Sequence, residues 1–150
     1  MAKIGVLGFQ GDVREHLATL NEIGASAVSV KTLSDLTSVD GLILPGGEST
    51  TIAKLSRIFG LFDPIKDAVA AGLPTFGTCA GLILLADEIL DGIEGQETFG
   101  GLDVVVRRNA FGHQTESFEI DLEVQGISGE PVTAAFIRCL LYTSDAADDT

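Results

Sequence analysis

Short apolar segments alternate with helical patterns along the first half of this chain. Residues 3–8, 27–30 and 39–44 are mainly aliphatic, and the first and third of these segments run directly into glycine-containing turns. Apolar segments of this length, bounded by turns, are typical of buried parallel strands. Parallel strands in one sheet need long crossover connections, which helices supply. The sequence therefore predicts an α/β fold: a doubly wound, mostly parallel sheet with its functional site at the carboxyl ends of the strands.

Capping and breaking residues indicate where the intervening helices begin and end. Asp12 is expected to cap a helix that ends at Gly24. Residues 48–51 have the composition of a capped helix start, directly after a Pro-Gly-Gly turn. A further helix is predicted over residues 63–70, with Pro64 in its first turn.

The second half of the chain lacks this alternation. Residues 102–106, 117–122 and 131–137 have strand composition, with no long helical pattern between them, which predicts an antiparallel extension on one side of the sheet. Residues 139–150 end in a small, acidic run without a periodic apolar face. We expect this end of the chain to be disordered.

Length and composition limit the classes of function. A chain of 150 residues has the size of one domain with a single core. Its net charge of −13 repels phosphate backbones and anionic lipid surfaces, so neither nucleic acid nor a membrane is an expected partner. Two cysteines sixty positions apart, without a signal peptide or a long apolar run, favour a reducing, cytoplasmic setting and no disulfide framework.

Cys79 lies in a Gly-x-Cys-x-Gly run between a short apolar stretch and a helix-forming one. Glycines on both sides allow the sharp strand-to-helix turn that lifts a nucleophile clear of a sheet edge. The start of a helix also favours the thiolate, because its unpaired N–H groups and dipole stabilise negative charge. A buried structural cysteine is the competing interpretation, but the flanking glycines favour covalent acyl-transfer chemistry at Cys79.

Three loops carry the most distinctive residues: Gly-Phe-Gln-Gly-Asp at 8–12, Pro-Gly-Gly-Glu-Ser-Thr at 45–50 and Gly-Thr-Cys-Ala-Gly at 77–81. In this order, and with matching segments at 13–16, 108–112, 117–119 and 136–138, the chain resembles the glutaminase subunits of pyridoxal 5′-phosphate synthases, which are class I, triad-type glutamine amidotransferases. The resemblance runs from Lys3 to Arg138, which we take as a partial glutaminase domain over residues 1–138. It implies a flavodoxin-like sheet, incomplete at the carboxyl end of the chain.

The resemblance implies hydrolysis of L-glutamine to glutamate and ammonia, without a metal or a cofactor. A synthase subunit in a hetero-oligomer would receive the ammonia by channelling and use it to build pyridoxal phosphate, vitamin B6. Cys79 matches the nucleophile. The backbone N–H groups of Gly47 and Ala80 match the oxyanion hole, and Gln10 matches a position that faces the partner and responds to its docking.

The family's glutamine-binding positions are also present, and an arginine among them suits the substrate carboxylate. They are Gly46, Gly47, Glu48, Ser49, Arg108, Ile137 and Arg138.

The chain departs from the family pattern after Arg138. The family takes its catalytic base and orienting carboxylate from a late His-x-Glu motif, whereas the two histidines here are His16 and His113, and neither belongs to such a motif. We interpret both as surface or interface residues and residues 139–150 as a tail unrelated to the family. Without the base, we expect glutamine hydrolysis by these residues to be lost or reduced by orders of magnitude.

Two other interpretations stay open at this point. One is a catalytically silent module that still binds the synthase. The other is an unrelated flavodoxin-like cysteine hydrolase or small-molecule binder, since one fold supports many functions.

Overall fold

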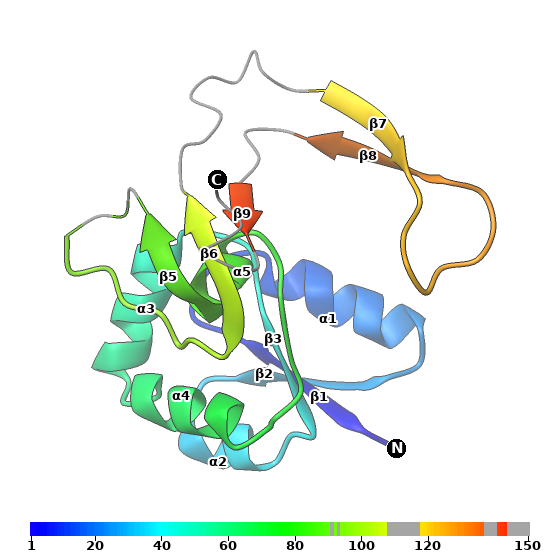
Figure 1. The fold of residues 1–150 in the computed structure, drawn as a ribbon. Coiled ribbons are helices and arrows are strands. Elements are labelled where there is room, and N and C mark those ends of the chain that lie inside the picture. The colour runs from blue at the N-terminus through cyan, green and yellow to red at the C-terminus, as the bar shows by residue number, and fades with distance from the viewer. Residues whose placement is uncertain (91, 93, 108–117, 137–140, 144–150) are drawn as a thin grey trace.

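A four-stranded parallel sheet forms the centre of the molecule. The computed structural model describes residues 1–90, 92, 94–107, 118–136 and 141–143. The sheet has the order β2-β1-β3-β4, and every neighbouring pair is parallel. Its strands are β1 (Lys3–Leu7), β2 (Ser26–Val30), β3 (Gly41–Leu44) and β4 (Thr75–Gly77). The predicted parallel α/β sheet is confirmed (Figure 1).

Helices connect these strands, as the alternation predicted. They are α1 (Val13–Glu22), α2 (Leu33–Thr37), α3 (Ser49–Ile58), α4 (Phe62–Ala70) and α5 (Ala80–Leu85). Gly24 follows the end of α1 with φ +76°, a conformation that glycine adopts without strain. The carboxylate of Glu48 caps α3 by accepting a hydrogen bond from the Thr51 N–H. These helix signals in the sequence are therefore confirmed.

The expected capping role of Asp12 is wrong. Asp12 precedes α1, but its side chain makes no capping hydrogen bond. Its carboxylate lies instead 3.7 Å from the imidazole of His16, one helical turn further on. Helix α2 was not predicted at all; Thr32 and Asp35 form a capping box at its start.

The second half of the chain contributes two smaller sheets. In one, β5 (Ala86–Leu90) pairs in parallel with β6 (Leu102–Arg107), and β9 (Leu141–Thr143) pairs antiparallel with β6. The other is the antiparallel hairpin of β7 (Phe118–Leu122) and β8 (Val132–Phe136), which lies apart from the central sheet in Figure 1.

Antiparallel pairing is present in β6–β9 and β7–β8, but these strands belong to two sheets separate from the central one, which they were expected to extend. Two further expectations change. Strand β5 was not predicted, because the apolar run that ends α5 continues into it without a break. The expected disorder of residues 139–150 is wrong for Leu141–Thr143, which form β9 and pair antiparallel with β6.

The core lies between the central sheet and its helices. Leu7, Leu44, Ile52, Ile65 and Leu84 have no exposed surface. Burial of each such side chain contributes about 1.5–3 kcal/mol to stability. Within the described residues, no helix is both long and apolar enough to cross a membrane.

Candidate active site

Cys79 lies at the turn between β4 and α5 and is exposed to solvent. Its φ of 50° and ψ of −106° make it the one non-glycine residue with positive φ among those that the structure describes. Such a conformation costs about 1–3 kcal/mol, so the surrounding structure must enforce it. Solvent exposure on a strained strand-to-helix turn is the geometry predicted for a nucleophile, and the buried-cysteine interpretation is wrong.

The flanking glycines are required because backbone segments touch there. A Cβ at Gly77 would lie 2.5 Å from the carbonyl group of Gly81. A Cβ at Gly81 would overlap the carbonyl oxygen of Leu44, at the end of β3. Any larger side chain would therefore push the turn away from β3.

The Gly46–Gly47 turn after β3 borders Cys79. A Cβ at Gly46 would lie 3.5 Å from the Cβ of Cys79, so a bare backbone faces the cysteine at this point. A Cβ at Gly47 would lie 2.5 Å from the Gln10 Oε1 atom and 2.9 Å from the Gly11 Cα atom. Gly47 therefore needs glycine for space, whereas a Cβ at Gly46 would make ordinary van der Waals contact with Cys79.

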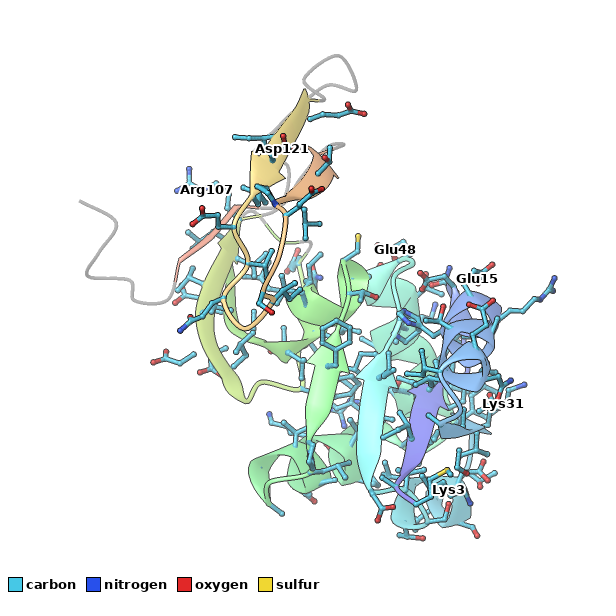
Figure 2. The ribbon with its side chains drawn as sticks, turned by 90° about the vertical axis from the view of Figure 1, so that its right-hand side faces the viewer. Lys3, Glu15, Lys31, Glu48, Arg107 and Asp121 are labelled. Atoms are coloured by element: carbon cyan, nitrogen blue, oxygen red, sulfur yellow. The ribbon has the colours of Figure 1, made fainter. Side chains whose placement is uncertain are left out.

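Hydrogen bonds join the three loops that follow β1, β3 and β4. The Asp12 N–H donates to the Gly46 carbonyl at 3.0 Å, and the Thr78 N–H donates to the Leu44 carbonyl at 3.1 Å. The Glu48 N–H donates to the Gln10 Oε1 atom at 2.9 Å. These three loops therefore meet at the carboxyl edge of the sheet, where the functional site was expected. Figure 2 shows Glu48 at this end of the sheet and Lys3, at the start of β1, at the other.

Glu48 and Ser49 begin α3 beside this turn. Hydrogen bonds from the hydroxyl group of Thr50 and from the N–H of Thr51 hold the pKa of the Glu48 carboxyl group below its usual value. Ser49 is only 1% exposed, and its hydroxyl oxygen accepts a hydrogen bond from the Gln96 side chain at 3.0 Å. Both predicted glutamine-binding residues are thus held in place by neighbouring groups.

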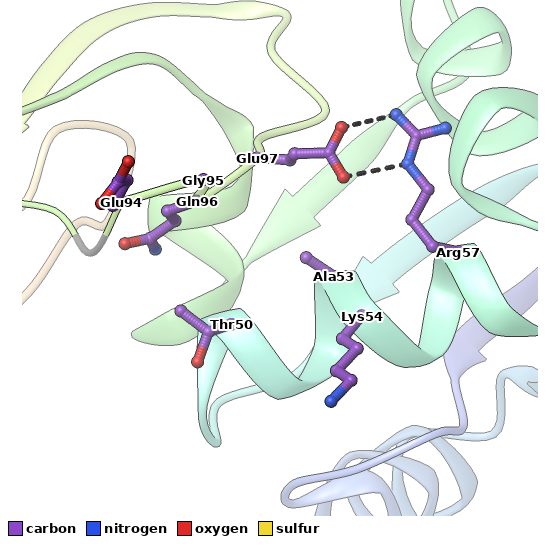
Figure 3. Close-up of a pocket in the computed structure, with 8 residues that line it drawn as sticks. All are labelled: Thr50, Ala53, Lys54, Arg57, Glu94, Gly95, Gln96 and Glu97. Atoms are coloured by element: carbon purple, nitrogen blue, oxygen red, sulfur yellow. Dashed lines mark hydrogen bonds and ion pairs between the residues drawn. The ribbon is translucent and has the colours of Figure 1, made fainter.

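A cavity of about 350 Å³ lies against α3 (Figure 3). Its lining consists of Thr50, Ala53, Lys54, Arg57, Glu94, Gly95, Gln96 and Glu97. Arg57 closes one end through a two-point contact with Glu97, whose carboxylate oxygens lie 2.6 and 2.9 Å from the guanidinium nitrogens. This contact fixes the segment that carries Gln96 beside Ser49. Sequence analysis missed Gln96, since no short-range pattern links it to α3.

His16 is not the surface residue that the charged sequence of its helix suggested. Its side chain is 18% exposed. The Nε2 atom lies 3.0 Å from the hydroxyl oxygen of Thr78, the residue before the nucleophile. The four-residue spacing between Asp12 and His16 was the available signal, because side chains at that spacing meet on one helix face.

The structure brings together Gln10, Gly46, Gly47, Glu48, Ser49, Cys79 and Ala80 from the predicted set. Arg108, Ile137 and Arg138, like His113, lie outside the described residues. Their roles stay predictions.

Comparison with known proteins identifies the family. The model of the SNO glutamine amidotransferase family matches residues 6–149, so the match continues past Arg138 into the segment that the sequence analysis took as unrelated to the family. The chain belongs to this family. Among solved structures, this SNO family chain is similar to one described as a crystal structure of glutamine amidotransferase, with 46% sequence identity and a TM-score of 0.81 over 93% of this chain and 72% of that one.

Two curated relatives of this SNO family chain are named pyridoxal 5′-phosphate synthase subunit PdxT. The protein of Parafrankia sp. (strain EAN1pec) is 60% identical over 136 residues, which are 91% of this chain and 67% of the relative. That of Streptomyces avermitilis is 56% identical over 145 residues, which are 97% of this chain and 72% of the relative. The chain thus spans about two thirds of their length.

A more distant structure shares the fold alone. A putative peptidase E from Listeria monocytogenes EGD-e superposes with a TM-score of 0.57 at 14% identity, over 68% of this chain and 63% of that one. Membership of an amidotransferase family argues against the interpretation as an unrelated cysteine hydrolase.

Proposed function

We propose that the chain is the glutaminase subunit of a pyridoxal 5′-phosphate synthase. It hydrolyses L-glutamine to L-glutamate and ammonia, and a synthase subunit in the same complex consumes the ammonia. One observation carries the proposal: Cys79 is exposed on a strained turn, in contact range of the glycine turn after β3. The 60% identity to a pyridoxal 5′-phosphate synthase subunit supports the choice of pathway.

The attack on glutamine and the stabilisation of the charge that it creates are assigned to groups at the carboxyl edge of the sheet. The Cys79 thiolate attacks the side-chain amide carbon of glutamine, and the carbonyl oxygen becomes an oxyanion. The N–H groups of Gly47 and Ala80 stabilise that charge. The carbon–nitrogen bond then breaks, and the leaving nitrogen takes a proton from solvent water, so that ammonia departs and the γ-glutamyl thioester remains. Water hydrolyses the γ-glutamyl thioester, which releases glutamate and restores the thiol.

The amino-acid end of glutamine is assigned to the start of α3 and to the carboxyl-terminal part of the domain. Glu48 and Ser49 are proposed to bind it with Ile137, and Arg108 and Arg138 supply planar guanidinium groups suited to a carboxylate. Gln10 is proposed to face the synthase. Because its amide oxygen already accepts the Glu48 N–H, docking at Gln10 would act directly on the glycine turn.

A silent synthase-binding module is the second candidate, and a sequence observation favours it. The 150 residues contain no His-x-Glu motif, and their histidines are His16 and His113. The Nε2 atom of His16 is engaged with Thr78. We therefore expect these residues alone to hydrolyse glutamine orders of magnitude more slowly than a relative that carries the motif, although Cys79 and its loops are in place.

Two measurements on the full chain, with and without a synthase subunit, test the proposal. A chloroketone analogue of glutamine should alkylate Cys79 faster than iodoacetamide does, because it uses the substrate-binding groups. Cys79→Ser should abolish this labelling, and mass spectrometry identifies the modified residue. Ammonia release then separates the two candidates: selective labelling with turnover supports the glutaminase, and complex formation without turnover supports the silent module. Equal rates with both reagents would contradict a glutamine site.

A further inference from the structure

The side chain of His16 reaches from α1 to the nucleophile turn. Its Nε2 atom lies 3.0 Å from the Thr78 hydroxyl oxygen and 3.7 Å from the Asp12 Oδ1 atom. Asp12 in turn touches the loop that borders the nucleophile: its N–H donates to the Gly46 carbonyl, and a Cβ at Gly46 would lie 3.4 Å from its carboxylate. One partly buried imidazole therefore contacts Thr78 directly and is linked to the Gly46–Gly47 turn through Asp12.

Thr78 is held by three different parts of the molecule. Its N–H donates to the carbonyl of Leu44 in β3 at 3.1 Å, and its carbonyl accepts from the Gly81 N–H in α5 at 2.8 Å. The contact of its hydroxyl group with His16 is the one that reaches across to α1. Because Cys79 occupies a strained conformation, the residue before it must be fixed from several directions.

We propose that His16 is a positioning residue that sets the Cys79 thiol relative to the glycine turn after β3. It acts through Thr78 on the nucleophile and through Asp12 on Gly46. The position of the sulfur relative to the proposed oxyanion donors is thereby fixed by one side chain. This inference rests on the proposed function, because alignment of these groups matters for attack on an amide. An error of about 1 Å in such alignment can cost about 100-fold in rate.

The geometry separates this role from that of a catalytic base. The imidazole nitrogen contacts the residue before the cysteine, and the link to the sulfur runs through the peptide unit. The contact joins residues 62 positions apart, so it connects α1 to the turn across the fold. Removal of the imidazole should therefore impair alignment while the thiol stays exposed.

Variants of the two partners test the inference in the full chain. His16→Leu removes the polar ring nitrogen, Thr78→Val removes the hydroxyl group at nearly constant shape, and His16→Gln places an amide near the position of Nε2. The readout is the rate of Cys79 alkylation by the glutamine chloroketone divided by its rate with iodoacetamide. The chloroketone needs alignment with the glycine turn, whereas iodoacetamide needs only an exposed thiolate.

We expect His16→Leu and Thr78→Val each to lower this ratio about tenfold or more. The double variant should be no worse than His16→Leu alone, since that change already removes the contact with Thr78. His16→Gln should recover the ratio to within about threefold of the wild type, because an amide can replace the lost hydrogen bond. Glu22→Gln, near the far end of the same helix, is the matched control and should leave the ratio unchanged.

The outcomes distinguish this inference from the proposed function. If wild-type Cys79 shows no preference for the chloroketone, the glutamine site itself is contradicted. If the wild type shows the preference and both single variants retain it, or if their effects multiply in the double variant, the positioning role of His16 is overturned. Should His16→Leu fail to fold by circular dichroism, Thr78→Val and His16→Gln still decide the question.

Discussion

At the scale of single residues, the strain at Cys79 is maintained by the absence of side chains around it. Gly77 and Gly81 allow the turn to rest on the end of β3, and Gly46 leaves a bare backbone beside the thiol. A glycine at Gly11 is equally required, since its φ is +100° and a Cβ there would overlap the Gly46 carbonyl. Glycines that look like ordinary loop residues in the sequence thus position Cys79, the proposed nucleophile.

Glu48 predicts a pH dependence of stability. Its carboxyl pKa in the folded chain lies below the usual 4.5, chiefly because it accepts a hydrogen bond from the Thr50 hydroxyl group. A lowered folded pKa means that its stabilisation is complete above pH 4.5 and is lost as the pH falls through the lowered value. Urea unfolding between pH 7 and pH 3 should show this loss as a fall in the free energy of unfolding.

The variant Glu48→Gln isolates this contribution. It cannot ionise, so the free energy of unfolding of the variant should depend less on pH over the same range. The part that remains comes from carboxylates such as Glu97, whose pKa is also lowered, mainly by its hydrogen bonds with Arg57. An unchanged pH dependence in Glu48→Gln would show that this carboxylate does not couple to folding.

At the scale of elements, the short helix α2 depends on its first turn. The Thr32 hydroxyl oxygen accepts the Asp35 N–H at 3.1 Å, and the Asp35 carboxylate accepts the N–H groups of Lys31 and Thr32, each at 3.0 Å. Thr32→Ala should lower the free energy of unfolding by about 1 kcal/mol, the usual value of a threonine cap. Ser34→Ala, an exposed change in the same helix, is the control for urea unfolding, and an equal effect of the two would exclude the cap as the cause.

The elements that were predicted from the sequence have patterns within a few consecutive residues, whereas those that were missed have weaker local patterns or none. The strands around residues 3–8 and 39–44 were predictable because long apolar runs end in glycine turns. Helix α2 has five residues, too few for helical periodicity, and only its capping box marks it. The side chain of Asp12 was placed wrongly because the N–H groups of α1 and the imidazole of His16 are both possible partners of its carboxylate. The position of that imidazole depends on the tertiary fold.

At the scale of the whole molecule, the exposed turn that carries Cys79 was predictable, and the contacts that support this turn were not. A Gly-x-Cys-x-Gly run after a strand is a local pattern that predicts a sharp strand-to-helix turn with an exposed central residue. The contacts of His16 with Thr78 and of Gln96 with Ser49 join residues 62 and 47 positions apart. No periodicity in one sequence encodes such a pair, because each depends on how the helices pack against the sheet.

The position of the site predicts where a synthase subunit binds. Cys79 opens to solvent at the carboxyl edge of the sheet, and ammonia released there would diffuse into bulk water and become protonated. A partner that receives it must therefore cover this edge, around residues 8–12 and 46–51.

Addition of the synthase subunit should slow amide hydrogen exchange in these two segments. The segments at the opposite edge, 38–40 and 71–74, which precede β3 and β4, serve as internal controls. Slower exchange at 38–40 and 71–74 with none at the loops would place the partner on the wrong side of the sheet for ammonia transfer.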